Sequence, residues 1–239
     1  MRMKSENNLN LGRIKGGLNS PGSTKRILLP IHSEELAEFI GIILGDGNIH
    51  SYKKGKKVGV YSIRIAGDLK LDYNYHVNFI KPLGERLFWL KAGIRKISKH
   101  NEIFTCFYSR EMVRFLNDNG LHSGDKITNR LGIPQWVKDD ENYLKACLRG
   151  IIDTDGSIFR MSQRDNNLLR IGFTNHNPKL LSDTRDAFIK LGYHPSKIIR
   201  NRTFFVSRQS DVVKYINEVG FSNRKHRSRL HTFLFSPVV

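Results

Sequence analysis

A short apolar phrase occurs twice in this chain and constrains its fold more than any other feature. Residues 39–47 read FIGIILGDG, and residues 148–156 read LRGIIDTDG. Both phrases end in Asp-Gly, and the two aspartates are Asp46 and Asp155. An apolar run that stops at a glycine is typical of a helix with its C-terminal end at that point. The sequence therefore predicts two similar helices, each with one carboxylate at its end.

The repeat extends beyond the two phrases. Residues 112–121 (MVRFLNDNGL) align without a gap with residues 212–221 (VVKYINEVGF), with Val, Asn and Gly identical. Both halves read as helix, strands, helix, strands, helix, which indicates an internal duplication. We assign residues 1–27 to a basic N-terminal arm, residues 28–138 to the first half and residues 139–239 to the second. The arm is either an unstructured tail or a segment that follows a phosphate backbone.

The internal glycines of the phrases, Gly41 and Gly150, predict how the two helices meet. A glycine inside a helix costs about 1 kcal/mol relative to alanine, and close approach of two helix backbones would offset this. If the helices pack in parallel, Asp46 and Asp155 lie side by side at one end. Adjacent carboxylates at the negative ends of two helix dipoles repel each other, and a divalent cation relieves that repulsion. Oxygen ligands favour a hard ion such as Mg²⁺, which also binds phosphate oxygens.

Composition indicates the partner of such a site. The chain has 40 Lys and Arg against 22 Asp and Glu, a net charge of +18, which favours nucleic acid first and an anionic membrane surface second. No apolar run approaches the ~18 residues of a membrane span, and no secretory signal is visible. Cys106 and Cys147 have no Cys-x-x-Cys or His neighbours, so we expect buried thiols in a reducing, intracellular environment.

At the repeated phrases the sequence resembles the LAGLIDADG homing endonucleases, specifically the single-chain form with two motifs. Residues 148–156 match the family signature at most positions, and residues 39–47 match it at the glycine, one isoleucine and the final Asp-Gly. The resemblance covers roughly residues 30–235. It implies an α/β (α+β) fold of two pseudo-symmetric αββαββα half-domains that form a saddle. The motif helices would pack at the central interface, and a four-stranded sheet of each half would lie in the DNA major groove.

The resemblance also implies an activity. It predicts a monomeric, site-specific endonuclease that hydrolyses both strands of a long, pseudo-palindromic DNA site and leaves short 3′ overhangs. Mg²⁺ is the expected cofactor, with Mn²⁺ as a substitute and Ca²⁺ as an ion that binds without supporting cleavage. An intron RNA maturase and a non-cleaving, sequence-specific DNA-binding protein on the same fold are the alternatives. The expected location is the cytoplasm or nucleoid in a prokaryote, or an organelle if the gene lies in an organellar intron.

The family pattern assigns candidate roles at the motif ends and after the last helix of each half. The final motif acids would bind metal together with their neighbours, and one basic residue per half would support the attacking water. The metal candidates are Asp46, Asp155, Gly45 and Thr154, and the basic candidates are Lys126 and Lys225. Arg224 and His226 are neighbours that the alignment does not separate from Lys225. The alternative for these lysines is plain phosphate contact.

Two departures from the signature concern the motif helices. The first copy has Leu44 where the second keeps Asp153, at a position that is structural in the family. Arg149 replaces a small alanine, and we expect its side chain to point away from the helix interface.

Polar residues on the predicted hairpins would contact DNA. Alternating residues after each motif flank turns rich in lysine or asparagine, which is typical of a hairpin with one polar face. Such faces suit base and phosphate contacts, and the alternative is a solvated, charged hairpin. The candidates are His50, Tyr52, Lys54, Lys57, Ser62, Arg64, Arg160, Ser162, Arg164, Arg170, Arg200 and Arg202.

Overall fold

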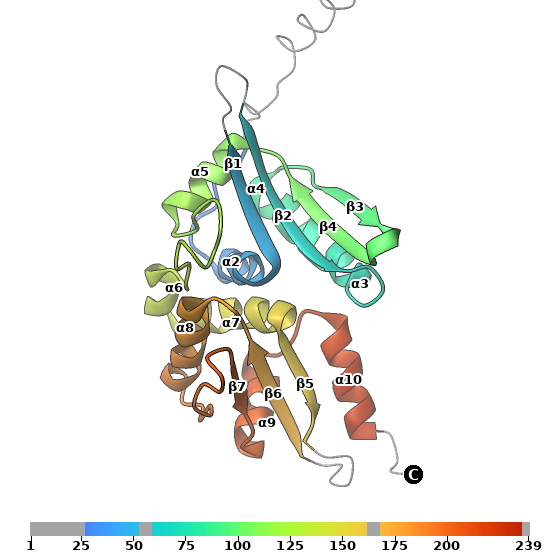
Figure 1. The fold of residues 1–239 in the computed structure, drawn as a ribbon, viewed down its shortest axis with the longest axis vertical. Helices are drawn as coiled ribbons and strands as arrows, with labels where there is room; N and C mark the ends of the chain where they lie inside the picture. The colour runs from blue at the N-terminus through green and yellow to red at the C-terminus, as the bar shows by residue number, and fades with distance from the viewer. Residues whose placement is uncertain (1–26, 53–58, 162–167, 236–239) are drawn as a thin grey trace, which may run out of the picture.

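The computed structural model describes residues 27–52, 59–161 and 168–235, and it consists of two similar halves around a central pair of helices (Figure 1). The first half contains α2 (Glu34–Asp46), β1 (Gly47–Tyr52), β2 (Val60–Asp68), α3 (Tyr73–Tyr75), a π-helical turn (His76–Ile80), α4 (Lys81–Phe88), β3 (Gly93–Ile97), β4 (Glu102–Phe107) and α5 (Arg110–Asp118). A short helix, α6 (Gln135–Asp139), leads to the second half. That half contains α7 (Glu141–Asp155), β5 (Gly156–Arg160), β6 (Leu169–Thr174), α8 (Pro178–Lys190), β7 (Thr203–Val206), α9 (Gln209–Glu218) and α10 (Arg224–Phe235).

Each half has one antiparallel sheet with an apolar face and a polar face. The first sheet has the order β1-β2-β4-β3, and the second has the order β5-β6-β7. In the first sheet Ile63 pairs with Phe107 and both are buried, so this face joins the core. Side chains alternate along a strand, so Arg64 and its partner Cys106 face the other side. The register therefore fixes which residues of each hairpin can meet a ligand on the open face.

The second sheet differs from the predicted four strands. Among the described residues it has three, and the segment before β7 makes only single ladder contacts. Ser196 donates its backbone N–H to the carbonyl of Phe205 at 2.8 Å, and Ile199 forms an isolated bridge with Thr203. Pro195 directly precedes Ser196 and has no N–H to donate, so the ladder does not extend beyond Ser196 in that direction.

A helix that the sequence analysis did not predict follows the last helix of the repeat unit. This helix, α10, lies beside β5 at the edge of the second sheet (Figure 1). From the sequence, only a basic stretch around Lys225 is expected here. No helix of the described residues is long and apolar enough to cross a membrane. Cys106 and Cys147 are buried, free thiols, as the sequence predicts.

The motif helices α2 and α7 pack against each other through their glycines. A Cβ atom on Gly41 would overlap the carbonyl oxygen of Cys147, and one on Gly150 would overlap the carbonyl oxygen of Glu38. A Cβ on Gly150 would also lie 2.8 Å from the backbone nitrogen of Ile42. These are backbone contacts that side-chain rotation cannot relieve. The predicted role of both glycines, to permit close helix approach, is confirmed.

Arg149 does not point away from the interface, so that prediction was wrong. Its guanidinium donates to the Glu38 carboxylate at 2.7 Å and to the carbonyl of Val219 at 3.0 Å. Glu38 lies on α2 and is 5% exposed, and the hydroxyl of Ser222 also donates to it. Glu38 on the first motif helix is thus paired across the interface, and loss of Arg149 would leave its carboxylate buried without a cation.

This ion pair gives a stability prediction. Arg149→Met is expected to lower the free energy of unfolding by about 2 kcal/mol, because it leaves the Glu38 carboxylate buried without its cation. Denaturant unfolding monitored by circular dichroism measures the loss. The matched control is Arg86→Met, which breaks the exposed pair with Glu35 and should cost no more than about 0.5 kcal/mol. Equal losses in the two variants would contradict a structural role for the buried pair.

Candidate active site at the ends of the motif helices

The two motif aspartates meet at the same end of the helix pair. Asp46 is the last residue of α2, and Asp155 is the last residue of α7. A Cβ atom on Gly45 would lie 3.4 Å from the carboxylate of Asp155 and would overlap the side chain of Thr154. The C-terminal ends of the helices are therefore in contact, and the predicted pairing of the two carboxylates is present.

Burial and mutual repulsion act on both carboxyl groups. Burial is the largest cause that raises the pKa of Asp46 to about 7, and the nearby charge of Asp155 adds to it. Lys225 and Lys126 act in the opposite direction on this pKa. Burial also raises the pKa of Asp155, while Lys126 and a hydrogen bond from Asn175 lower it. The pair thus binds positive charge, whether as protons or as a cation, more tightly than exposed aspartates do.

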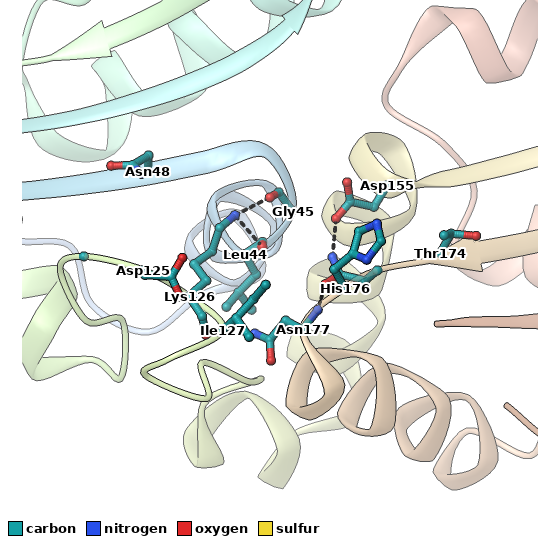
Figure 2. A pocket seen from close by; sticks show the side chains of 12 residues that line it. Leu44, Gly45, Asn48, Asp125, Lys126, Ile127, Asp155, Thr174, His176 and Asn177 are labelled. Atoms are coloured by element: carbon teal, nitrogen blue, oxygen red, sulfur yellow. Dashed lines mark hydrogen bonds between the residues drawn. The ribbon is translucent and has the colours of Figure 1, made fainter. Parts of the chain in front are cut away.

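An open pocket lies next to Asp155, between the two halves (Figure 2). Its volume is about 300 Å³. The first half contributes the end of α2, Asn48 and the loop that carries Lys126, and the second half contributes Asp155 with residues 174–177. In this pocket the side-chain amide of Asn175 donates to Asp155 at 2.7 Å, which fixes the carboxylate. The pocket therefore joins a carboxylate of one half with a lysine of the other.

Lys126 binds the end of the first motif helix. Its ammonium group donates to the carbonyl of Leu44 at 2.9 Å and to that of Gly45 (Figure 2). It also donates to the carbonyl of Ile43. The last carbonyls of a helix lack partners within it, so a cation here is favourable, although that of Ile43 also accepts the backbone N–H of Gly47. The Gly45 carbonyl, a predicted metal ligand, is therefore occupied by Lys126 in this structure. The hydroxyl of Thr154 turns back to the carbonyls of Gly150 and Ile151.

Lys225 lies at the start of α10 and has a different partner. Its ammonium group forms an ion pair with Asp72 at 2.9 Å, and its side chain is 16% exposed. The preceding turn is held by Asp153, whose carboxylate accepts the backbone N–H groups of Ser222 and Asn223 at 2.7 and 2.9 Å. Asp153 therefore has the structural role that the resemblance implies, and it holds the loop that carries Lys225.

The two residues beside Lys225 differ in solvent exposure. His226 is fully buried, and burial lowers its pKa to about 4, so it is a neutral packing residue. Arg224 is exposed at the first position of α10. Of the basic candidates, Lys126 and Lys225 are the two whose charges act on both motif aspartates.

The predicted DNA contacts divide by the face on which they lie. His50 is exposed and pairs with Ser62, and Arg64 lies on the same open face. Arg170 also lies on the open face, over the ring of Phe205 at 4.8 Å. Arg200 and Arg202 are exposed on the turn before β7. Lys54, Lys57, Ser162 and Arg164 lie outside the described residues, as does the side chain of Tyr52.

Two of the predicted contacts need correction. Ser62 is fully buried on the inner strand β2 and cannot reach a base. Arg160 shares the core side of β5 with Ile158, and its guanidinium donates to the carbonyl of Phe233 on α10 at 3.1 Å. The alternation of the strand, combined with the unpredicted α10, therefore makes Arg160 a packing residue.

Sequence reasoning missed several residues of the site. Asn175 follows directly after β6 and contacts Asp155, and His176 lines the same pocket. Arg95 on β3 is exposed and pairs with Phe104 on the open face. A polar pair directly after a predicted strand, as in Asn175-His176, is a signal that could have been used. No pattern links Asp72 to Lys225, because the two residues come from different halves.

The residues present fit a divalent cation. Two facing carboxylates with raised affinity for positive charge form a hard, all-oxygen donor set, which favours Mg²⁺, Ca²⁺ or Mn²⁺. Within the described residues no cluster of three or more His, Cys, Asp or Glu side chains could hold a metal without other ligands. Asp46 and Asp155 would therefore need oxygens from a substrate or from solvent to complete the coordination.

Titration of Asp46 gives a second stability prediction. The folded pKa of about 7 lies above the unfolded value of 3.8, so the ionised form destabilises the folded state as pH rises through this range. Without metal, Asp46→Asn should therefore stabilise the protein more at about pH 8 than at about pH 5, by on the order of 2 kcal/mol. Denaturant unfolding in the presence of a chelator measures this difference. Added Mg²⁺ should stabilise the wild type and not the variant, and a gain that does not depend on pH would contradict the placement of Asp46.

Comparison with known proteins supports the fold and the resemblance of the second half to the LAGLIDADG family. Residues 142–227 match the sequence family described as LAGLIDADG-like domain. Replication factor C small subunit from Methanocaldococcus jannaschii is 25% identical over 207 residues. That alignment covers 83% of this chain but only 10% of the relative, so the chain spans about a tenth of that protein.

The solved structures that resemble this chain include homing endonucleases. A structure of variants of the homing endonuclease I-DmoI superposes with a TM-score of 0.57 at 16% identity, covering 78% of this chain and 95% of the other. I-DmoI in complex with DNA and Ca gives 0.54 at 19% identity, covering 78% and 88%. The meganuclease I-SmaMI bound to DNA gives 0.54 at 14% identity, covering 84% and 87%. At these identities the structural likeness establishes the fold.

Proposed function

Because the chain has the fold of the LAGLIDADG homing endonucleases and carries a LAGLIDADG-like domain in its second half, we propose that it is a site-specific double-strand DNA endonuclease. One observation carries this proposal. The two motif helices bring Asp46 and Asp155 together at the end of the interface, beside a pocket and two open sheet faces. The two motifs therefore do more than pack the helices together, because they also bring two carboxylates to one place.

Phosphodiester hydrolysis needs an activated water, a stabilised leaving oxygen and a fixed substrate. Asp46 and Asp155 would hold the metal, which when bound supplies Lewis-acid stabilisation of the scissile phosphate. Asn175 fixes one oxygen of Asp155, so the carboxylate keeps a single orientation. The ammonium groups of Lys126 and Lys225 add positive charge beside the pair and would orient the attacking water or the phosphate. Structures of I-DmoI with DNA include Ca or Mn, and one of a variant was obtained in the presence of Mg, which supports a divalent ion here.

Binding to DNA should depend strongly on salt. The net charge is +18, and exposed basic residues lie on the sheet faces and on the turn before β7. If ~6–10 phosphates are neutralised, the affinity should fall by ~10³–10⁵ between 50 and 200 mM salt. Fluorescence anisotropy with a labelled duplex across a salt series measures the slope. A nearly flat dependence would contradict a large phosphate-binding surface.

The proposal is tested by sequencing DNA ends after the protein is incubated with a randomised duplex library and Mg²⁺. Staggered cuts with short 3′ overhangs at one long, pseudo-palindromic motif are expected, and they should disappear with a chelator or in Asp155→Asn. Enrichment of one motif without cut ends would instead favour a DNA-binding protein. If the protein neither cuts nor selects DNA, intron RNA becomes the partner to test. Sedimentation of the complex would test the proposed monomer.

A further inference from the structure

The two halves hold each other's lysine-bearing loops through equivalent residues. Asp72 precedes α3 in the first half, and Asn177 precedes α8 in the second. Both side chains are nearly buried, with exposed fractions of 7% and 3%. Each contacts the loop after the last repeat helix of the opposite half. This exchange relates the halves by the same pseudo-twofold symmetry as the motif helices.

One carboxylate oxygen of Asp72 accepts two hydrogen bonds from the loop that follows α9 in the second half. It accepts from the ammonium group of Lys225 and from the side-chain amide of Asn223, both at 2.9 Å. The same amide of Asn223 donates to the carbonyl of Asp153 at 3.2 Å. The ammonium group of Lys225 is thus fixed at one end of the motif-helix pair by a carboxylate from the first half.

Asn177 binds the loop of the first half through the backbone. Its amide donates to the carbonyl of Lys126 at 3.2 Å and to that of Leu131 at 2.6 Å. Its side-chain oxygen also accepts the backbone N–H of Lys179 at 3.1 Å, so Asn177 is the N-cap of α8. Lys126 lines the pocket that also contains Asp155, while its ammonium group donates to carbonyls at the end of α2 (Figure 2).

We propose that the two halves exchange their lysines, so that Lys225 serves the half-site of Asp46 and Lys126 serves that of Asp155, and that Asp72 is the residue that positions Lys225. This inference rests on the proposed endonuclease function. The contacts between the halves carry this assignment. Asp72 of the first half holds Lys225, and Asn177 of the second half holds the loop of Lys126, which lines one pocket with Asp155.

Strand-resolved cleavage tests this exchange. A duplex that contains the selected target carries a different fluorophore on each strand, and the cutting of each strand is followed separately in Mg²⁺. Asp72→Asn is expected to slow one strand about tenfold or more and the other by less than about threefold, so nicked DNA accumulates. Lys225→Met should slow the same strand, and Lys126→Met should slow the opposite one.

The matched control is Asp68→Asn in the same turn. Asp68 accepts from the backbone of Lys70 and Leu71 and from Asn101, and it makes no contact with Lys225. Loss of a turn contact alone should affect both strands equally, so Asp68→Asn should show no strand bias. Thermal unfolding of both variants confirms that each one folds.

A double-mutant cycle separates positioning from general destabilisation. In the Lys225→Met background, Asp72→Asn should have almost no further effect on cutting, because the group that it positions is absent. Equal slowing of both strands by Asp72→Asn, or full additivity with Lys225→Met, would overturn the exchange. If the wild-type protein cuts no DNA under any condition, the proposed function fails, which is a different result from cutting without strand bias.

Discussion

Asp155→Asn is expected to lower the rate of double-strand cleavage by at least ~10³-fold, equivalent to about 4 kcal/mol of transition-state stabilisation. The asparagine keeps the size of the side chain but removes the negative charge that a divalent cation needs. Binding to the target should change less than threefold, because Asp155 lies at the end of α7 and is not part of the basic sheet faces. Cleavage under single-turnover conditions and binding in Ca²⁺ measure the two effects separately.

Asp118→Asn is the matched control for this substitution. Asp118 is exposed at the C-terminal end of α5, so the change is chemically the same but lies away from the motif helices. It should leave cleavage unchanged. Asp46→Asn should behave like Asp155→Asn, because the two carboxylates would hold the metal together. Loss of binding together with cleavage in Asp155→Asn would contradict its assignment as a metal ligand.

The second large effect concerns the helix interface. Gly150→Ala is expected to lower the free energy of unfolding by about 3 kcal/mol, although alanine favours a helix by about 1 kcal/mol over glycine. The added Cβ would overlap the carbonyl of Glu38 and lie 2.8 Å from the backbone nitrogen of Ile42, so the helices must separate. A shift in the midpoint of denaturant unfolding measures this change.

Gly93→Ala is the control for the interface variant. Gly93 lies at the start of β3, and a Cβ there would meet nothing within 4 Å. Its effect should stay within about 0.5 kcal/mol. A stabilised Gly150→Ala protein would show that helix propensity dominates at this position, and it would contradict the close contact of the motif helices.

The sequence was sufficient to predict the elements of the centre of this protein. The duplicated phrase gave two helices that end in acids, and the cost of Gly41 and Gly150 within helices required a close partner. The repeat supplied that partner, so the pairing of Asp46 with Asp155 followed from symmetry. These inferences succeeded because each motif carries its own helix signal, and the repeat indicates that the two motif helices pack against each other in equivalent positions.

Only the tertiary structure decided which side chains complete the site. The ion pair of Arg149 with Glu38 and that of Lys225 with Asp72 join residues from different halves. Periodicity shows which face of an element is buried, but it does not show which residue of another element lies opposite. The same limit explains the burial of Ser62 and the packing of Arg160 against α10, since both depend on neighbours far away in the sequence. The sequence by itself determined the helices and their carboxylates, whereas three-dimensional packing decided their partners.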